Sequence, residues 1–548
     1  MSQQELERGA GTLKDRLLAG EGTVVVLGVG YVGLPLAVKL AKGEGTRNFS
    51  VIGVDILGER IEMLLQGKSP IEGIDDKDIE DVVNNSHKLK PLHVYDSDPK
   101  APDPRPAPET IRPLVGADVF VICVPTPLDS EEQWKPDMRW IKKAAKLLGH
   151  VCELEAAEGA LPTERLIVLE STSYPGTTRE YFGEFIDTYK TDGRQWFLAY
   201  SPERTNPGKK NTHETDPKEP KDMFDIKRVV GGLDTPDREH AEAFYKNIFK
   251  EVEPVASLEA AEMVKLVENT FRFTVIGFAN EMSRVARSFG LNIWDIMHAV
   301  KTKEFGLGIC DPGLVGGHCI PIDPQYLNWA FRNQRQIAAF IDVAEKAHQE
   351  MKRDALELIQ RLLNQNNRGI AGSSILFLGV AYKKNVADTR ESAALDLMKK
   401  LYSSGADVYF WDPVRAKHTE KRPVHLEFSN EEFKQLPPKK QEGLEPNHRH
   451  YYLEPSVQPG NSWDEAREEI LSTKYDCIVI STDHDDFQPI YEELITAEVP
   501  RPLADLRNAI ESWLSQWVKE ERLTEEKAAE LRQKLSSQRS KYMLLGVH

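Results

Sequence analysis

The segment whose residues could most clearly take part in a chemical reaction is a glycine-rich loop that contains a cysteine, residues 316–324 (GGHCIPIDP). Paired glycines allow the backbone to approach a ligand closely. Asp323 and Pro324 are typical of the N-cap and the first residue of a helix, which we expect to follow them. A thiolate near a helix N-terminus is stabilised by the backbone dipole, so Cys319 could act as a nucleophile. It could equally be a buried small hydrophobic residue, and the local context does not separate the two interpretations.

A long helix expected at residues 258–289 carries a second group of candidate residues. Lys265 and Asn269 lie four residues apart and share one face with Arg272, three residues further on. A lysine and an amide side by side can stabilise a developing oxyanion, and losing one such donor typically costs roughly 10²–10³ in rate. The same spacing is also found on solvated helix faces, and without other evidence the solvated face is the preferred interpretation of this segment.

A glycine-rich turn near the N-terminus indicates a dinucleotide site. A β-branched run at residues 23–27 predicts a buried parallel strand that leads into residues 28–33 (GVGYVG) and an expected helix at 34–42. The next expected strand, residues 50–54, ends in an aspartate that can bind ribose hydroxyls, while the glycines permit a tight turn beside a pyrophosphate. Because a carboxylate repels a 2′-phosphate, NAD is favoured over NADP. The predicted cofactor contacts of this segment are Gly28, Gly30, Tyr31, Val32, Gly33 and Asp55.

Further candidates follow the later strands expected in this unit, at residues 118–123, 165–169 and 196–200. Ligands of parallel sheets bind beyond the carboxyl ends of the strands. Four polar residues are therefore expected near the cofactor or substrate: Thr126, Thr172, Glu203 and Arg204. Arg60, on the helix after the second strand, could reach the cofactor or be solvated.

Other segments complete the expected α/β plan. Asp137 is expected to cap a helix at 138–150, and the polar residues 206–227 to form a loop. A second α/β unit is predicted from residue 373, with a helix from about Glu391 and strands at 375–378, 407–411, 475–481 and 502–506. The polar residues 414–461 are too long for an ordinary connection and predict an insertion. The charged residues 519–541 predict a helix that is solvated or faces a partner.

The composition limits the classes of function. At 548 residues the chain is too long for one core, and a net charge of −17 argues against nucleic-acid binding. Five scattered cysteines without metal-ligand spacing predict a reducing compartment and no metal site. No signal peptide is visible, and the longest apolar run, residues 24–38, is too short to span a membrane. We therefore expect a cytoplasmic protein.

Together, these motifs resemble the nucleotide-sugar 6-dehydrogenases (the UDP-glucose and GDP-mannose dehydrogenase family) over nearly the full length of the chain. They occur in the family's order: Gly28 to Gly33 with Asp55, Glu170-Ser171-Thr172, Ser201-Pro202-Glu203-Arg204, Lys265 with Asn269, Gly316 to Asp323, and Lys383 with Asp388 to Ser392. The form Ser201 to Arg204 followed by Asn206-Pro207-Gly208 is similar to the branch that acts on UDP-N-acetylhexosamines. UDP-glucose enzymes usually carry an aromatic residue at position 204.

The resemblance implies two Rossmann-like, doubly wound parallel-sheet domains of the α/β class, joined by a long central helix. The expected parts are a polar leader (1–20), an NAD-binding domain (21–255), a central helical dimerisation domain with the cysteine loop (256–355), a C-terminal UDP-sugar-binding domain (356–515, with the insertion 414–461) and a charged helical tail (516–548). The expected partners are a UDP-sugar, UDP-GlcNAc or UDP-ManNAc, and a second copy of the chain, without nucleic acid or membrane.

The resemblance also implies roles in a reaction that converts a C6 alcohol to a carboxylate in two NAD-dependent oxidations. Cys319 would capture the aldehyde as a thiohemiacetal and then carry a thioester, which water positioned by Asp323, Glu203 and Thr172 would hydrolyse. Asp323 could instead simply cap its helix. Substrate contacts are expected from Glu203, Arg204, Lys265, Asn269, Arg272, Gly316, Lys383 and Arg507, with Lys265 and Asn269 holding the charged oxygen, and a further cofactor contact is expected from Arg390.

Three other functions remain open. UDP-glucose is an alternative substrate for the same reaction. A hydroxyacid dehydrogenase of the 6-phosphogluconate type shares the layout, but it needs no cysteine and consumes one NAD per substrate. A non-catalytic, nucleotide-sensing scaffold would form no NADH with any UDP-sugar, although Cys319, Lys265 and Asn269 argue against it.

Overall fold

The computed structural model divides the chain into two compact units. The first comprises residues 1–269 and 322–337 and the second residues 270–321 and 338–548, so the boundary falls inside the long helix α10 (Leu258–Ser288). The residues described are 11–43, 48–71, 73–95, 105–129, 134–160, 162–189, 194–204, 211–213, 216–221, 223–303, 308, 310–317, 319–417, 424–428, 430–441, 450–453, 463–472, 474–496, 502–537 and 542–545.

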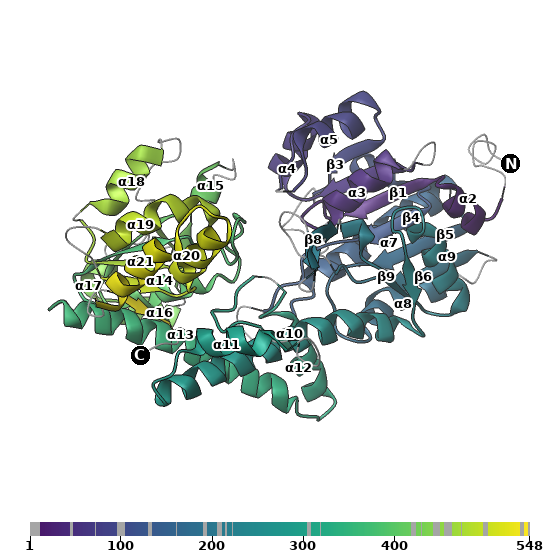
Figure 1. Cartoon of the computed structure of the whole chain (residues 1–548). Coiled ribbons are helices and arrows are strands. Elements are labelled where there is room, and N and C mark those ends of the chain that lie inside the picture. The colour runs from purple at the N-terminus through teal and green to yellow at the C-terminus, as the bar shows by residue number, and fades with distance from the viewer. Residues whose placement is uncertain are drawn as a thin grey trace. The chain divides into compact units, whose positions relative to one another are not determined.

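The first unit is built on an eight-stranded sheet with the strand order β10-β9-β6-β5-β4-β1-β2-β3 (Figure 1). Neighbouring strands pair in parallel, except that β6 and β9 are antiparallel. The central strands are continuous apolar runs, which suits strands that are covered on both faces. The strands are β1 (Thr23–Leu27), β2 (Ser50–Asp55), β3 (Leu89–His93), β4 (Val119–Ile122), β5 (Glu164–Leu169), β6 (Gln195–Tyr200), β9 (Arg228–Gly232) and β10 (Val252–Pro254).

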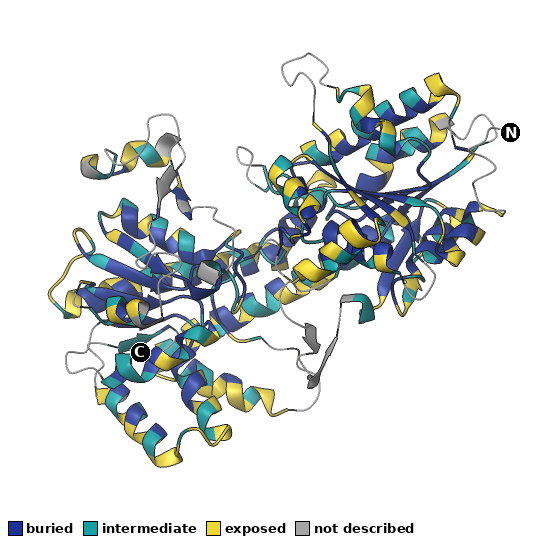
Figure 2. Cartoon of the chain, turned by 90° about the horizontal axis from the view of Figure 1, so that it is seen from above, coloured by how far each residue is buried: buried dark blue, intermediate teal, exposed yellow. Residues whose placement is uncertain are grey.

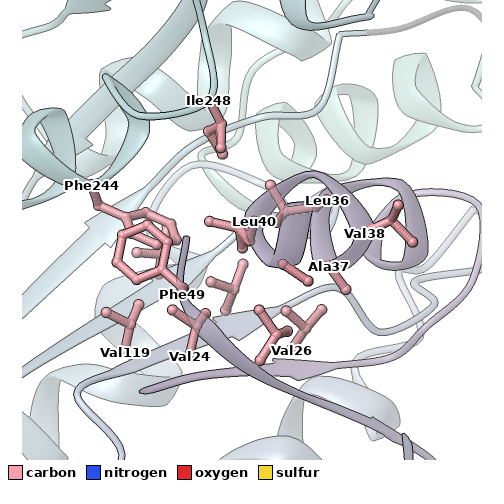
Figure 3. Close-up of a cluster of buried hydrophobic side chains, with 14 of the residues drawn as sticks. Val24, Val26, Leu36, Ala37, Val38, Leu40, Phe49, Val119, Phe244 and Ile248 are labelled. Atoms are coloured by element: carbon pink, nitrogen blue, oxygen red, sulfur yellow. The ribbon is translucent and has the colours of Figure 1, made fainter. Parts of the chain in front are cut away.

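Helices bury the apolar faces of this sheet. Leu36 and Leu40 of α3 join Val24 of β1 in one core cluster (Figure 3). Phe49, just before β2, meets Phe244 of α9 in the same cluster, with ring centroids 5.6 Å apart. Each fully buried side chain of this size contributes roughly 1.5–3 kcal/mol. The main helices of the unit are α2 (Leu13–Ala19), α3 (Gly33–Lys42), α4 (Gly58–Leu65), α7 (Arg139–Glu158), α8 (Thr177–Tyr189), α9 (Thr235–Tyr245) and α12 (Asp323–Asn333).

The second unit holds a five-stranded parallel sheet with the order β12-β11-β15-β16-β17. Phe377 of β11 joins a core cluster with α13 and α14, whereas the adjacent Leu378 joins a cluster with α19, α20 and α21. Figure 2 shows these strands buried and the outer faces of the helices exposed. The main elements are α11 (Ile293–Lys301), α13 (Ala339–Gln365), β11 (Ser374–Leu378), α14 (Ala393–Ser403), β12 (Asp407–Trp411), β15 (Cys477–Ile480), α19 (Gln488–Thr496), β16 (Leu503–Asp505), α20 (Ala509–Lys519), α21 (Glu525–Ser537) and β17 (Tyr542–Leu544).

The predicted strands of both sheets are confirmed to within two residues at each end, but some helices differ. The helix expected at 138–150 continues to Glu158, because Val151 and Cys152 extend its buried face. The helix expected from Glu391 begins at Ala393. In the N-terminal leader, α2 is capped by Thr12, and its two buried leucines belong to the core of the first unit.

The predicted loop and the predicted insertion both contain regular structure. The expected loop 206–227 includes β7 (Asn211–His213), which pairs antiparallel with β8 (Asp216–Lys221). The expected insertion 414–461 includes a small antiparallel pair, β13 (His425–Glu427) with β14 (His450–Tyr452). Its apolar residues Leu426 and Phe428 are buried in the core of the second unit, so this segment adds to that core.

The charged C-terminal segment also takes part in the second fold. Leu531 and Leu535 of α21 pack in the cluster on one face of the five-stranded sheet, and β17 pairs in parallel with β16. The predicted helix, expected to be solvated or to face a partner, instead packs its apolar residues on the sheet of its own unit. Among the residues that the structure describes, none of the helices is both long and apolar enough to cross a membrane.

Candidate active site

The turn between β1 and α3 has the shape that a dinucleotide needs. Gly28 has a φ of +92°, and a Cβ on it would lie 2.7 Å from the carbonyl oxygen of Cys123. A Cβ on Gly33 would lie 2.0 Å from the carbonyl oxygen of Gly28, so both positions require glycine. A Cβ on Gly30 would meet only Arg60, at 3.9 Å, so the protein leaves space in front of this residue. These residues fit a pyrophosphate at the N-terminus of α3.

The other predicted cofactor contacts lie beside the turn between β1 and α3. Asp55 ends β2 and is buried, and its carboxylate accepts hydrogen bonds from the amides of Val29 (3.1 Å) and Leu57 (2.9 Å). Arg60, for which a solvated position was equally open, donates to Asp55 at 2.8 Å. Tyr31 packs at the edge of the core, and Val32 is the N-cap residue of α3.

Helix α12 packs on the carboxyl ends of β4 and β5, although it lies far from them in the sequence. The hydroxyl of Tyr326 donates to the carbonyl oxygen of Thr126 at 2.9 Å, and Thr126 is buried. The ring of Trp329 lies 4.8 Å from that of Tyr174, in the loop after β5. Thr172 is half-buried in the same loop. Helix α12 therefore reaches the edge of the sheet at which ligands of such folds bind.

Four of the predicted catalytic side chains come together in the first unit. Lys265 Nζ lies 3.6 Å from Glu203 Oε2, and Asn269 Nδ2 donates to Asp323 Oδ2 at 2.5 Å. Lys265, Glu203 and Asp323 are all buried. Because Lys265 and Asn269 are one turn apart on α10, they face the loop after β6 and the start of α12 together. The alternative of a solvated helix face is wrong.

The environment of Asp323 changes its acidity. Burial raises the pKa of Asp323 to about 6, although the charge of Lys265 and the hydrogen bond from Asn269 lower it. Helix α12 begins at Asp323, and its N-cap residue is Ile322. The prediction that Asp323 is the N-cap is therefore wrong, because its carboxylate bonds to the α10 side chain instead.

Arg204 is engaged with α10. Its guanidinium Nε donates to the Glu268 carboxylate at 3.0 Å, and Nη1 donates to the carbonyl oxygen of Lys227 at 2.9 Å. This ion pair holds the loop after β6, which also carries Glu203. Residues 206–208, which contribute to the family resemblance, lie outside the described residues.

In the second unit, the glycine-rich loop packs against the segment that follows β11. A Cβ on Gly316 would lie 2.8 Å from the carbonyl oxygen of Glu391, and a Cβ on Gly317 would lie 2.7 Å from the ring of Tyr382. The Gly317 amide donates to the carbonyl oxygen of Arg390 at 3.2 Å. The paired glycines, expected to admit a ligand, here admit other parts of the protein. Cys319 is half-buried in this unit, four residues before Asp323 in the sequence.

Two predicted substrate contacts of the second unit, Lys383 and Arg507, are cations in partly desolvated positions, whereas the third, Arg272, is exposed. Burial and the neighbouring Arg272 charge lower the pKa of Lys383, and burial lowers the pKa of Arg507. Arg507 Nη1 would lie 3.3 Å from a Cβ on Gly313, so it reaches the loop that precedes the cysteine. A partly desolvated cation is stabilised when it pairs with an anion such as a diphosphate, because charge-assisted hydrogen bonds are strong.

Arg390, a predicted cofactor contact, forms a two-pronged pair with Asp388. Arg390 Nη2 donates to the Asp388 carboxylate at 2.6 Å, and Nε donates to it at 2.9 Å. The guanidinium therefore already has an acidic partner within its own segment.

Sequence analysis missed several residues that organise the site. Asn280 of α10 bonds to both backbone groups of Gly313, at 3.1 and 2.8 Å, and so fixes the loop that leads to Cys319. Buried Arg228 of β9 pairs with Glu170 at 2.6 Å and donates to Ser201 Oγ at 2.7 Å, which ties together the ends of β5 and β6. Glu170 and Ser201 are the first residues of two motifs on which the family resemblance rests, so the sequence could have indicated their importance. Arg228 belongs to none of these motifs, so the sequence did not indicate its role.

The described part of the chain contains no group of three or more histidine, cysteine, aspartate or glutamate side chains arranged to hold a metal ion.

Comparison with protein families gives consistent matches along the chain. Residues 22–249 match the NAD binding domain of the UDP-glucose/GDP-mannose dehydrogenase family, residues 259–350 its central domain and residues 376–512 its UDP binding domain. The match to an NAD binding domain confirms the predicted cofactor, which the turn at Gly28 to Gly33 fits.

Individual relatives agree with the domain matches. A UDP-N-acetyl-D-mannosamine dehydrogenase from Methanococcus maripaludis is 32% identical over 71% of this chain and 79% of its own length. A UDP-N-acetyl-D-glucosamine 6-dehydrogenase from Pseudomonas aeruginosa is 27% identical over 71% of this chain and 82% of its own length. A solved structure of a UDP-D-ManNAc dehydrogenase from Pyrococcus horikoshii superposes with a TM-score of 0.66 at 26% identity, covering 89% of this chain and 96% of that one. With the dinucleotide turn and the buried lysine–carboxylate group in place, this chain belongs to the UDP-glucose/GDP-mannose dehydrogenase family of NAD-dependent oxidoreductases.

Proposed function

We propose that this protein oxidises the C6 hydroxyl of UDP-GlcNAc or UDP-ManNAc to a carboxylate. The proposal rests on the buried side chains of Lys265, Glu203 and Asp323 and the half-buried Asn269, which meet at the edge of the first sheet. The names of its relatives, dehydrogenases of UDP-N-acetyl-D-mannosamine and UDP-N-acetyl-D-glucosamine, support the choice of sugar. NAD, when bound, takes up the hydride that is released in each of the two oxidations.

Lys265 and Asn269 stabilise the sugar oxygen while it carries negative charge. The ammonium of Lys265 has three N–H donors and the amide of Asn269 has two, of which one is directed at Asp323. Donors that are already held in place act on developing charge without reorganising. Lys265, directly or through a water molecule, also helps to remove the hydroxyl proton in the first oxidation.

Cys319 keeps the intermediate attached between the two oxidations. Its sulfur adds to the aldehyde carbon to give a thiohemiacetal, and loss of the second hydride leaves a thioester. Water then attacks the thioester carbon and releases the acid and the thiol. Asp323, Glu203 and Thr172 orient this water, which the ionised carboxylates do by accepting its hydrogen bonds.

The cations of the second unit hold the nucleotide part of the substrate. Lys383, Arg507 and Arg272 are matched to a diphosphate, because each lies in a position where a positive charge is partly desolvated or faces another cation. Arg204, where UDP-glucose enzymes usually carry an aromatic residue, contributes to the contact with the N-acetylated sugar.

The reaction can be tested by counting NADH and acid. Wild-type protein with UDP-GlcNAc, UDP-ManNAc, UDP-glucose and UDP-galactose is expected to form two NADH per molecule oxidised, with an N-acetylated sugar preferred. Cys319→Ser is expected to complete only the first oxidation, while Cys310→Ser serves as the control. Acid formation by Cys319→Ser at the wild-type rate would refute the thioester. One NADH per substrate would favour the hydroxyacid class, and no NADH with any sugar would favour the sensing scaffold.

We also propose that the protein is a homodimer through α10. Phe271, Phe278 and Val285 are spaced by seven residues and lie on one side of the helix, with 63%, 51% and 43% of their surfaces exposed. Exposed apolar side chains in such a row are typical of a surface that another chain covers. Phe278→Lys is expected to shift the mass measured by light scattering from two copies to one.

A further inference from the structure

A buried carboxylate on α10 contacts the N-terminus of α8 and has no part in the chemistry described above. Glu262 is fully buried and lies three residues before Lys265 and seven before Asn269, on the same face of α10. Its carboxylate accepts three hydrogen bonds. These come from the Gly176 amide (2.5 Å), the Thr178 amide (2.7 Å) and the Thr178 hydroxyl (2.6 Å).

The segment that Glu262 binds carries one residue of the site and contacts the helix of another. Residues 170–178 run from the end of β5 to the first turn of α8 and include Thr172. Tyr174 in this segment packs on Trp329 of α12, the helix that begins at Asp323. One carboxylate therefore fixes the Thr172 segment to the helix of Lys265 and Asn269, and the same segment contacts the helix of Asp323.

We propose that Glu262 is a positioning residue that sets the place of Thr172 relative to Lys265 and Asn269. The inference rests on the proposed function for the roles of those three residues. Burial raises the pKa of Glu262 to about 7, while the hydrogen bonds from Thr178 and Gly176 lower it. A buried carboxylate that lost these donors would be left without hydrogen bonds, which is energetically costly, so the three hydrogen bonds hold the segment in place. A displacement of about 1 Å in such a site can cost on the order of 100-fold in rate.

The chain offers a matched control one turn away. Glu259 joins the same two helices through an ion pair with Arg179 at 2.8 Å, but it is partly exposed and lies farther from Lys265. If the joining of α8 to α10 were all that mattered, loss of either glutamate would act similarly. Glu262→Gln keeps the side-chain volume but places an NH₂ group opposite one of the donors, whereas Glu259→Gln removes only a surface pair.

Steady-state kinetics and amide hydrogen exchange together test the proposal. Glu262→Gln is expected to lower kcat by roughly 10- to 100-fold, with the KM for NAD within about twofold of wild type, and to speed exchange at residues 171–178. Glu259→Gln is expected to change neither. Thr178→Val, which removes the hydroxyl donor and keeps the amide, is expected to show a smaller loss of kcat, and it replaces Glu262→Gln if that variant does not fold.

Two results would overturn the proposal. One is unchanged exchange at 171–178 in the variant, which can be read even if no UDP-sugar is oxidised. The other is a loss of kcat that is matched by an equal loss of NAD binding, since that would make Glu262 merely structural. Failure of the proposed function itself would show separately, as a wild-type protein that forms no NADH.

Discussion

In both units a glycine turn follows the first strand of the main sheet in chain order: Gly28 after β1 and Gly379 after β11. Both glycines have positive φ, +92° and +79°, and a Cβ on either would collide with the end of the adjacent strand, at Cys123 or Thr482. The fifth residue after the glycine differs between the units: it is Gly33 in the first and Lys384 in the second. Helix α3 begins at Gly33, whereas α14 begins only at Ala393, so only the first turn presents a helix N-terminus to a phosphate.

The aspartate at the end of the neighbouring strand differs in the same way. Asp55 and Asp412 each accept a hydrogen bond from the amide that follows the glycine, at 3.1 and 2.9 Å. The ring of His484 lies 3.2 Å from Asp412, and both side chains are fully buried. Asp55 pairs instead with Arg60, whose side chain is 21% exposed. The shared plan of strand, glycine and aspartate therefore specifies a fold, and only the surrounding residues make one copy a dinucleotide site.

The largest effect is expected at the buried aspartate of the second unit. Asp412→Ala leaves His484 and the backbone amides without their acceptor, which should cost about 3–5 kcal/mol of unfolding free energy. NAD affinity, which belongs to the first unit, should not change. Denaturant unfolding and calorimetric NAD titration measure the two quantities. Asp396→Asn, at a half-exposed pair with Lys352, is the control and should cost less than about 1 kcal/mol. Weakened NAD binding in Asp412→Ala would show that the two aspartates are not separate in function.

A smaller effect on free energy is expected at the turn of the first unit. Gly33→Ala places a Cβ 2.0 Å from the carbonyl oxygen of Gly28, and α3 must move away from the turn. Overpacking of this kind costs about 1–3 kcal/mol, so NAD should bind up to roughly 100-fold more weakly. Lys384→Ala changes the corresponding residue of the second unit, where the lysine pairs with Asp485, and should leave NAD affinity within about twofold. Equal losses in both variants would contradict the difference between the turns.

The smallest effect is a difference in pH dependence between the units. Asp323 has a raised pKa of about 6, so its stabilising contribution is present in full below the ordinary 3.8 and is lost as the pH rises through 6. Burial alone would raise the pKa of Asp412, but His484 and the backbone amides bring it below 3.8, so its contribution is lost only as the pH falls further. Turnover should therefore fall below about pH 6, where Asp323 is protonated, while the second unit stays folded.

Removing one hydrogen bond tests this assignment. Asn269→Ala deletes a bond that lowers the pKa of Asp323, so the acid limb of the kcat profile should move to higher pH. The profile is measured by NADH formation and the fold by circular dichroism across the same range. A limb that stays in place in Asn269→Ala would assign it to another group.

Sequence analysis identified the residues at the carboxyl ends of the strands, but the contacts among them were beyond it. The spacing of Lys265 and Asn269 showed that they share a helix face, yet it could not show whether that face was solvated or met Glu203 and Asp323. For Asp323 the sequence allows both a catalytic role and a helix cap, because capping is a local rule, whereas the partner of its carboxylate lies 54 residues away in the sequence. The sequence does not distinguish Glu262 from a solvated glutamate, because only its neighbours in the fold show that it is buried.

The sequence by itself determined the parallel sheets, the dinucleotide turn and the family, because these follow from local patterns of apolar residues, glycines and an aspartate that need no distant partner. Only the tertiary structure decided which polar side chains are buried and what they touch, as with Asp412 and His484 or Glu262 and Thr178. The physical reason is that the pKa, the partners and the position of a charged side chain are set by groups that come from other elements of the fold. Such encounters depend on how helices pack on a sheet, which the order of residues along one segment does not express.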